Sequence, residues 1–174
     1  GPFITPTARW GARMGDNKIV DMMVGALTDP FEVVHMGITA ENVAKEFNIS
    51  REEQDELAVE SHRRAINAIE NGYFNEQITP VTIKTRRGEV VFDTDEHARA
   101  DITLEGLAKM RPVFVKENGT VTAGNASGIN DGAAAVVLMS GDAVKKHGAK
   151  PLARLVAYAH AGVEPHIMGI GPVP

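Results

Sequence analysis

The chain of 174 residues contains no cysteine. This absence excludes disulfide bonds, thiolate metal sites and a cysteine nucleophile supplied by the chain itself. It also fits a reducing compartment, and we expect a cytoplasmic protein. No segment approaches the roughly 20 apolar residues that a membrane span requires, so we expect no membrane contact.

The chain also lacks an excess of basic charge. It has 18 Lys and Arg against 23 Asp and Glu, a formal net charge of -5. Nucleic-acid surfaces need clustered Lys and Arg, so this balance argues against a nucleic-acid partner. Hydrophobic residues make up 43% of the sequence, which is enough for a chain of roughly one domain's length to form a core.

The best-defined predicted helix begins at a capping box of Ser50 and Glu53, whose side chains each satisfy a free backbone amide. It should run to about Asn71, because Gly72 is a typical C-terminal stop. Shorter helices are expected over residues 19–27, 40–47 (with Thr39 as N-cap), 104–110 and 142–147, the last ended by Gly148.

Alternating and continuous apolar patterns predict the strands. Residues 78–84 and 89–92 should form a hairpin around a turn at 86–88, and residues 1–15 an irregular hairpin arm. Further strands are expected at 120–122, 133–139 and 152–163. The run 133–139 is continuously apolar, which is typical of a strand buried on both faces.

These patterns predict an α/β fold. A helix-rich α+β region precedes residue 120, and strand and helix then alternate as in a layered sheet. The last predicted strand and the helix-initiating prolines at 172–174 lead us to expect an internal piece of a larger protein.

A loop of small residues, Ala123 to Gly128, is the first candidate site. Glycine, alanine and serine allow a ligand to approach the backbone closely, and Asn125 and Ser127 offer hydrogen-bonding groups. A narrow ligand with amides would suit this groove. The alternative is a tight turn that serves packing only.

Three other segments could carry chemistry. His35 and Met36 could belong to a pocket for a flexible acyl chain, although a structural histidine is the alternative. Arg99 could bind a ligand phosphate through its fork of donors, or be an exposed solubilising charge. The acidic residues and histidine at 93–97 lack the spacing of a metal site and predict a solvated loop.

Two motif hypotheses find little support. Gly169-Ile170-Gly171 matches only half of a dinucleotide-binding fingerprint, and its role is expected to be a close approach of backbone to a ligand. No serine lies in a Gly-x-Ser-x-Gly elbow, so a serine hydrolase is unsupported.

Several stretches, in order along almost the whole chain, resemble the thiolase family of acyl-CoA acyltransferases. The shorter ones are HMGITAENVA at 35–44, SREEQD at 50–55, MRPVF at 110–114 and MGIGPVP at 168–174. The most specific is GTVTAGNASGINDGAAA at 119–135.

The resemblance implies a thiolase-like layered αβ core, of which only a part is present, with an inserted α+β loop domain. Residues 1–119 would be the oligomerisation arm and loop domain. Residues 120–148 would be the last part of the N-terminal half, and 149–174 the start of the C-terminal half. The arm implies a homo-oligomer, a dimer of dimers, when the protein is intact.

The resemblance also assigns substrate-binding residues along the small-residue loop. Ser127 would hydrogen-bond the pantetheine of coenzyme A, and Ala123, Ala126 and Gly128 would line its tunnel. This chain has Gly106 where family members often carry serine, a departure that puts one polar contact to the nucleotide in doubt.

The remaining implied contacts lie elsewhere in the chain. His35, Met36 and Met168 would lie near the reactive end of the substrate. Arg99 would meet the adenosine end, and Phe114 would form an apolar wall.

The resemblance implies transfer of an acyl group between coenzyme A thioesters, as in fatty acid metabolism, through an acyl-cysteine intermediate. Acyl-CoA molecules are the substrates, and no cofactor or metal is expected. The nucleophile and its proton-transfer partners would lie outside residues 1–174, so no catalytic residue is assigned here. The alternatives are a coenzyme A-binding module without catalysis and an oligomerisation element.

Overall fold

The longest helix in the computed structural model, which describes residues 1–174, is α3 (Arg51–Glu70). Ser50 Oγ accepts a hydrogen bond from the Glu53 N–H at 3.1 Å, and the Glu53 carboxylate accepts from the Ser50 N–H at 2.7 Å. The predicted capping box is therefore confirmed. Asn71 is the C-cap of the helix, and Gly72 follows with a φ of 71°, a left-handed conformation that favours glycine.

Helix α2 (Met36–Glu46) begins three residues before the expected N-cap, so the prediction of Thr39 in that role is wrong. The cap is His35, whose Nδ1 accepts a hydrogen bond from the Gly37 N–H at 3.0 Å. The imidazole acceptor takes the place of the usual serine or aspartate oxygen. Thr39 lies within the helix, where its hydroxyl donates to the Met36 carbonyl at 2.8 Å.

Three shorter α-helices confirm the predicted elements in type; the first two are shorter than predicted, and the third covers its whole predicted range. They are α1 (Met22–Ala26), α4 (Leu104–Ala108) and α5 (Gly141–His147). Gly148 ends α5 with a φ of 59°, as predicted. Two 3-10 helices, η1 (Pro6–Trp10) and η2 (Pro165–Ile170), complete the helical elements. None of the helices combines the length and the apolar character that a membrane span needs.

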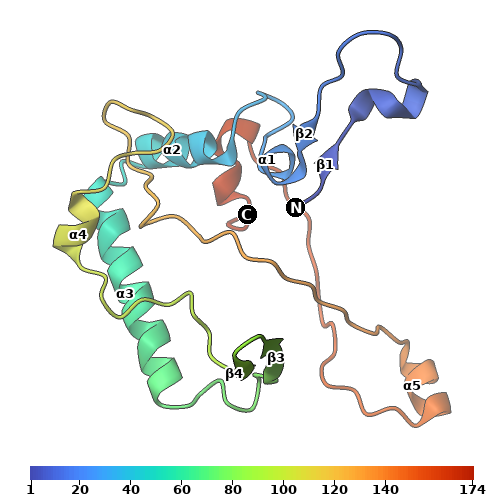
Figure 1. The fold of residues 1–174 in the computed structure, drawn as a ribbon. Helices are drawn as coiled ribbons and strands as arrows, with labels where there is room; N and C mark the ends of the chain where they lie inside the picture. The colour runs from blue at the N-terminus through green and yellow to red at the C-terminus, as the bar shows by residue number, and fades with distance from the viewer.

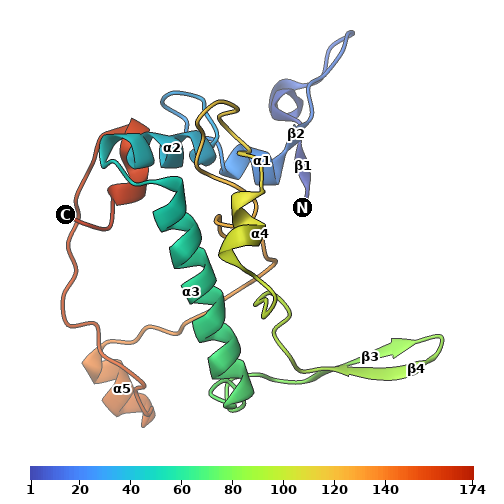
Figure 2. The same cartoon turned by 90° about the vertical axis from the view of Figure 1, so that its left-hand side faces the viewer.

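The strands form two antiparallel pairs. β3 (Val81–Thr85) and β4 (Gly88–Phe92) make the predicted hairpin, with Val81 opposite Phe92, and Figure 2 shows it projecting from the body. β1 (Phe3–Ile4) pairs with β2 (Val20–Asp21), so the N-terminal arm runs to Asp21 and not only to residue 15 as expected.

A small buried region, which we call the buried centre, extends from the contact of η2 with α2 to the place where the segment 119–125 and α4 lie against the start of α3 (Figure 2). Its buried apolar side chains are Ala44, Leu107, Val121 and Ile167. The amide of Asn42 in α2 donates to the His166 carbonyl of η2 at 2.9 Å, which joins segments 124 residues apart.

Three predicted strands are not formed, at 120–122, 133–139 and 152–163. The latter two segments run as irregular chain on either side of α5, and Val137 and Leu138 are each 84% exposed. A strand requires a neighbour that accepts and donates its backbone hydrogen bonds, and none lies beside these segments. The prediction of a strand buried on both faces is therefore wrong for this structure.

The accessible surface is correspondingly large. It measures 14967 Å² for a chain of 18.7 kDa, whereas a compact monomer of this mass would expose about 8,300 Å². Much apolar side-chain area therefore remains uncovered within this chain, and the well-packed part is confined to the buried centre.

Candidate functional site

The small-residue loop, defined here as residues 122–128, is attached to α2 by a buried carboxylate. Glu41 is 9% exposed and accepts hydrogen bonds from the Thr120 N–H at 2.8 Å, the Thr120 hydroxyl at 2.8 Å and the Val121 N–H at 2.9 Å. Backbone donors that would serve a strand ladder therefore bind a side chain. This explains why the strand predicted at 120–122 is absent and why the loop begins at a defined place.

Asn125 organises the loop from inside. Its Oδ1 accepts a hydrogen bond from the Thr122 N–H at 2.7 Å, and its Nδ2 donates to the Thr120 carbonyl at 2.9 Å. The same Nδ2 donates to Asp55 Oδ1 at 2.9 Å, which ties the loop to α3. The asparagine predicted as a possible ligand contact is thus committed to holding the loop.

Asp55 is the junction between α3, α4 and the loop. It is 4% exposed, and its Oδ2 accepts a hydrogen bond from Arg51 Nε at 2.8 Å. Arg51 also donates through Nη2 to the carbonyls of Leu107 and Met110, at the end of α4. These polar groups place α4 and the small-residue loop against each other.

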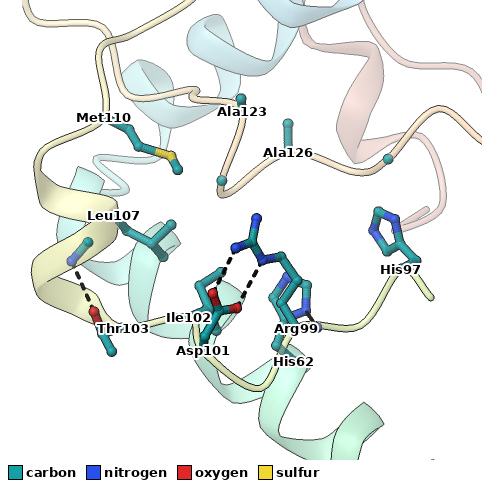
Figure 3. A pocket seen from close by; sticks show the side chains of 13 residues that line it. His62, His97, Arg99, Asp101, Ile102, Thr103, Leu107, Met110, Ala123 and Ala126 are labelled. Carbon is teal, nitrogen blue, oxygen red and sulfur yellow. Dashed lines mark hydrogen bonds and ion pairs between the residues drawn. The ribbon is translucent and has the colours of Figure 1, made fainter.

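The two elements enclose a pocket of about 270 Å³, which we call the α4 pocket (Figure 3). His62 of α3 forms its base, and four small residues of the loop form one wall. The facing wall comes from the segment 97–103 and from α4. The lining residues are His62, His97, Arg99, Asp101, Ile102, Thr103, Gly106, Leu107, Met110, Ala123, Gly124, Ala126 and Gly128.

Arg99 is the positive charge of the α4 pocket. Its Nε and Nη2 donate to Asp101 Oδ1 and Oδ2 at 3.0 and 2.8 Å, and its backbone N–H donates to His62 Nδ1 at 3.1 Å. The hydrogen bonds from Arg99 lower the pKa of the Asp101 carboxyl below its ordinary value. The pair therefore stays charged through neutral pH and is lost only in acid, as the pH falls through that lowered pKa.

Gly124 is required by the close packing at the pocket floor. A Cβ at this position would overlap Leu107 Cδ2 and lie 2.6 Å from Met110 Sδ. Gly128 is similarly close to the His97 ring. Small residues are therefore needed here for packing, as the tight-turn interpretation of the loop expects, and the ligand-binding interpretation stays a prediction.

Replacement of Gly124 by valine is expected to close the pocket floor and to lower the free energy of unfolding by about 2 kcal/mol through overpacking. Leu107 cannot move freely, because it is 1% exposed. Chemical denaturation would measure the change. Gly132, where an added Cβ would meet no atom within 4 Å, is the matched control and should lose less than about 0.5 kcal/mol. Equal losses at the two glycines would contradict the packing role.

The structure brings together four of the residues assigned from the sequence. Arg99, Ala123, Ala126 and Gly128 all line the α4 pocket, as Figure 3 shows for the first three by name. Ser127 lies between two of them along the chain, but it is exposed and does not line the pocket.

The other assigned residues lie around α2, apart from the α4 pocket. The ring of His35 stacks on Phe114 with centroids 4.6 Å apart, and a Cβ on Gly37 would overlap that ring. Met36 is the first residue of α2. Met168 lies in η2, which packs along α2. His35 thus has the structural role weighed as its alternative, as an N-cap against an aromatic ring.

Gly169 lies beside α2, where a Cβ would stand 3.6 Å from Val43, an ordinary van der Waals distance. The backbone of Gly169 therefore packs against helix α2. The structure brings no three His, Asp or Glu side chains together in a geometry that could hold a metal ion.

Five polar residues that build the site carry no clear signal in the sequence. His62, His97 and Asp101 line the α4 pocket, and Glu41 and Asp55 hold its loop. The segment 93–97, predicted to be a solvated loop, is exposed, and its His97, together with Arg99, also borders the pocket. The one available signal was Asp55 at an i+4 position from Arg51, a spacing that pairs charges on a helix.

The chain has an α/β fold in which a small-residue loop and an arginine line one pocket. Comparison with known proteins identifies the family that shares this sequence. The family model described as Thiolase, N-terminal domain, matches residues 2–142. The chain therefore belongs to the thiolase family.

Relatives over the same residues have closely similar sequences. Beta-ketothiolase BktB of Cupriavidus necator is 66% identical over 99% of this chain and 44% of its own length. Mitochondrial 3-ketoacyl-CoA thiolase of Mus musculus is 51% identical, with the same two coverages. The chain thus spans less than half the length of the curated relatives it matches.

Superposition on solved structures identifies the fold of this chain. Human mitochondrial 3-ketoacyl-CoA thiolase superposes with a TM-score of 0.83 at 49% identity, over 99% of this chain and 44% of that one. A crystal structure of the human enzyme in complex with CoA gives 0.81 at 48% identity, over 99% and 43%. The fold is part of a thiolase-like α/β domain.

Proposed function

We propose that the complete protein carrying this chain is a thiolase that cleaves or forms 3-ketoacyl-CoA. An enzyme cysteine thiolate would attack the 3-keto carbon, the bond to the α-carbon would break, and the α-carbon would take a proton from an enzyme acid to leave as acetyl-CoA. Coenzyme A would then take the acyl group from the acyl-cysteine. Acyl-CoA thioesters are the substrates, and no further cofactor is needed.

The α4 pocket is the observation that carries this proposal. It sets the guanidinium of Arg99 opposite the small residues Ala123 and Ala126 across one cavity (Figure 3). A guanidinium suits a phosphate, and a wall without bulky side chains suits a narrow chain such as pantetheine. A ligand that carries both groups, as coenzyme A does, matches the pocket.

Within this enzyme the chain supplies binding surface without the nucleophile. It holds no cysteine, so the acyl-cysteine must form on a residue outside residues 1–174. The isolated polypeptide is therefore expected to show no cleavage of acetoacetyl-CoA. The decrease in enolate absorbance would measure this, and turnover by the purified chain would contradict the assignment.

Replacement of Arg99 by alanine in the complete enzyme tests the binding role. The Michaelis constant for coenzyme A should rise about tenfold with kcat little changed, because a charged hydrogen bond to phosphate is lost. Arg64→Ala is the matched control, since Arg64 is also exposed and paired with a carboxylate, at 2.6 Å from Glu60, but does not line the pocket. An unchanged constant in Arg99→Ala would refute the role.

The N-terminal arm supports assembly of several copies. It projects from the body and exposes Trp10 to 87% and Phe3 to 66%. Exposed aromatic side chains on a projecting hairpin suit burial against another copy. We propose a dimer of dimers, located in the cytoplasm and acting in fatty acid metabolism, and light scattering of the complete enzyme would test the assembly.

A further inference from the structure

Arg99 forms hydrogen bonds with two other residues, and one of these residues lies on a different element of the fold. Its guanidinium is bound by Asp101, two residues further along the same segment. Its backbone N–H donates to His62 Nδ1 on α3, 37 residues away in sequence. The remaining donors of the guanidinium point toward the middle of the α4 pocket, as Figure 3 shows.

The bond to His62 matters because the segment that carries Arg99 is irregular. No strand or helix spans residues 93–103, so repeated backbone hydrogen bonds do not place it. The imidazole of His62 is half-buried on the rigid α3, and its Nδ1 must be unprotonated to accept this bond. A fixed acceptor on a long helix thus sets where the backbone of Arg99 lies.

The exposed ion pair alone would not achieve this placement. The side chains of Arg99 and Asp101 are 64% and 70% exposed, and such pairs contribute little to stability. Because the two residues are neighbours, the pair orients the guanidinium relative to its own segment. The one hydrogen bond that joins this segment to α3 is the bond to His62, whose ring also stacks on that of His97 with centroids 6.2 Å apart.

We propose that His62 is a positioning residue for the nucleotide end of coenzyme A, acting through Arg99. This inference rests on the proposed function and adds a residue to it. His62 holds the backbone of Arg99, Asp101 aims its guanidinium, and the donors left free bind phosphate. Preorganising a long side chain in this way reduces the entropy lost when the ligand binds.

Calorimetry with 3′-phospho-ADP, the nucleotide half of coenzyme A, tests the proposal in the complete protein. His62→Ala should weaken binding about 3- to 10-fold, the equivalent of one hydrogen bond. His62→Asn, which keeps an acceptor near the position of Nδ1, should bind nearly as well as the native protein. His147→Ala is the control, since this histidine lies on α5, away from the pocket.

A double-mutant cycle separates positioning from a general loss of structure. In an Arg99→Ala background, His62→Ala should have no further effect on binding of 3′-phospho-ADP, because the residue acts through Arg99. Full additivity of the two effects would overturn the proposal. So would failure of His62→Asn to restore binding while the protein remains folded.

Measuring the Michaelis constants of two thioesters tests the role of His62 separately from the thiolase activity itself. His62→Ala should raise the Michaelis constant for acetoacetyl-CoA but not that for acetoacetyl-pantetheine, which lacks the nucleotide. Equal increases for both would overturn the positioning role. If the native complete protein cleaves neither thioester, the thiolase assignment fails, and the calorimetric cycle still decides the role of His62.

Discussion

Replacement of Glu41 by alanine is expected to lower the free energy of unfolding of the complete protein by about 3 kcal/mol. The buried carboxylate accepts hydrogen bonds from the backbone N–H groups of Thr120 and Val121 and from the Thr120 hydroxyl. Alanine would leave these donors in a site that water barely reaches. Two buried amides without partners account for most of the loss.

Denaturation in urea would measure the effect, and hydrogen exchange would locate it. The amides of Thr120 and Val121 should exchange faster in Glu41→Ala, because they lose their acceptor. Glu41→Gln should have an intermediate effect, since an amide group replaces one of the two accepting oxygens. Glu46→Ala is the control on the same helix, where the side chain is 49% exposed. A loss no larger than that control would contradict the anchoring role.

Asp55→Ala is expected to have an effect of similar size, about 3 kcal/mol, because it breaks a buried ion pair by removing one partner. Arg51, whose side chain is only 18% exposed, would keep its charge without the carboxylate at 2.8 Å. Asn125 would lose one of the two acceptors of its Nδ2. The small-residue loop and α4 should therefore loosen together.

The matched control for Asp55→Ala is Glu105→Ala. Glu105 also forms an ion pair with a residue four positions away, Lys109, at 2.6 Å, but its side chain is 83% exposed. Its loss should cost less than about 0.5 kcal/mol. The Michaelis constant for coenzyme A should rise in Asp55→Ala and stay constant in Glu105→Ala. Equal stability in the two variants would show that the buried pair does not hold the site.

The roles of these two carboxylates could not be predicted from the sequence. Glu41 and Asp55 both look like exposed acidic residues of amphipathic helices, and their partners lie 79 and 70 residues away. The hydrogen bonds depend on which helix face meets the segment 119–125. Local sequence contains no information on that contact without a known relative.

Only part of the α4 pocket could be predicted from the sequence, again because some of its residues take their role from spatial neighbours. The small-residue loop stood out because glycine and alanine in one run signal close packing or ligand approach. His62 and Asp101 gave no such signal, since an isolated histidine on a helix and an aspartate in a charged segment are common on any surface. Their role follows only from their positions beside Arg99.

By itself the sequence determined the local elements, because their causes lie within a few residues. The capping box of Ser50 and Glu53 begins α3, Gly148 ends α5, and the turn at 86–88 closes the β3–β4 hairpin. The specific run at 119–135 also indicated the family. Capping and turn formation depend on backbone amides and dihedral angles that neighbouring residues satisfy.

Only the tertiary structure decided which extended segments became strands and which polar residues formed the site. Residues 133–139 have a strand-like sequence, yet they lie exposed because no neighbouring strand pairs with them. Glu41, Asp55 and His62 became important because distant backbone and side-chain donors meet them. Strand pairing and buried hydrogen bonds both require partners from elsewhere in space, and the packing of α2, α3 and α4 determines which partners are available.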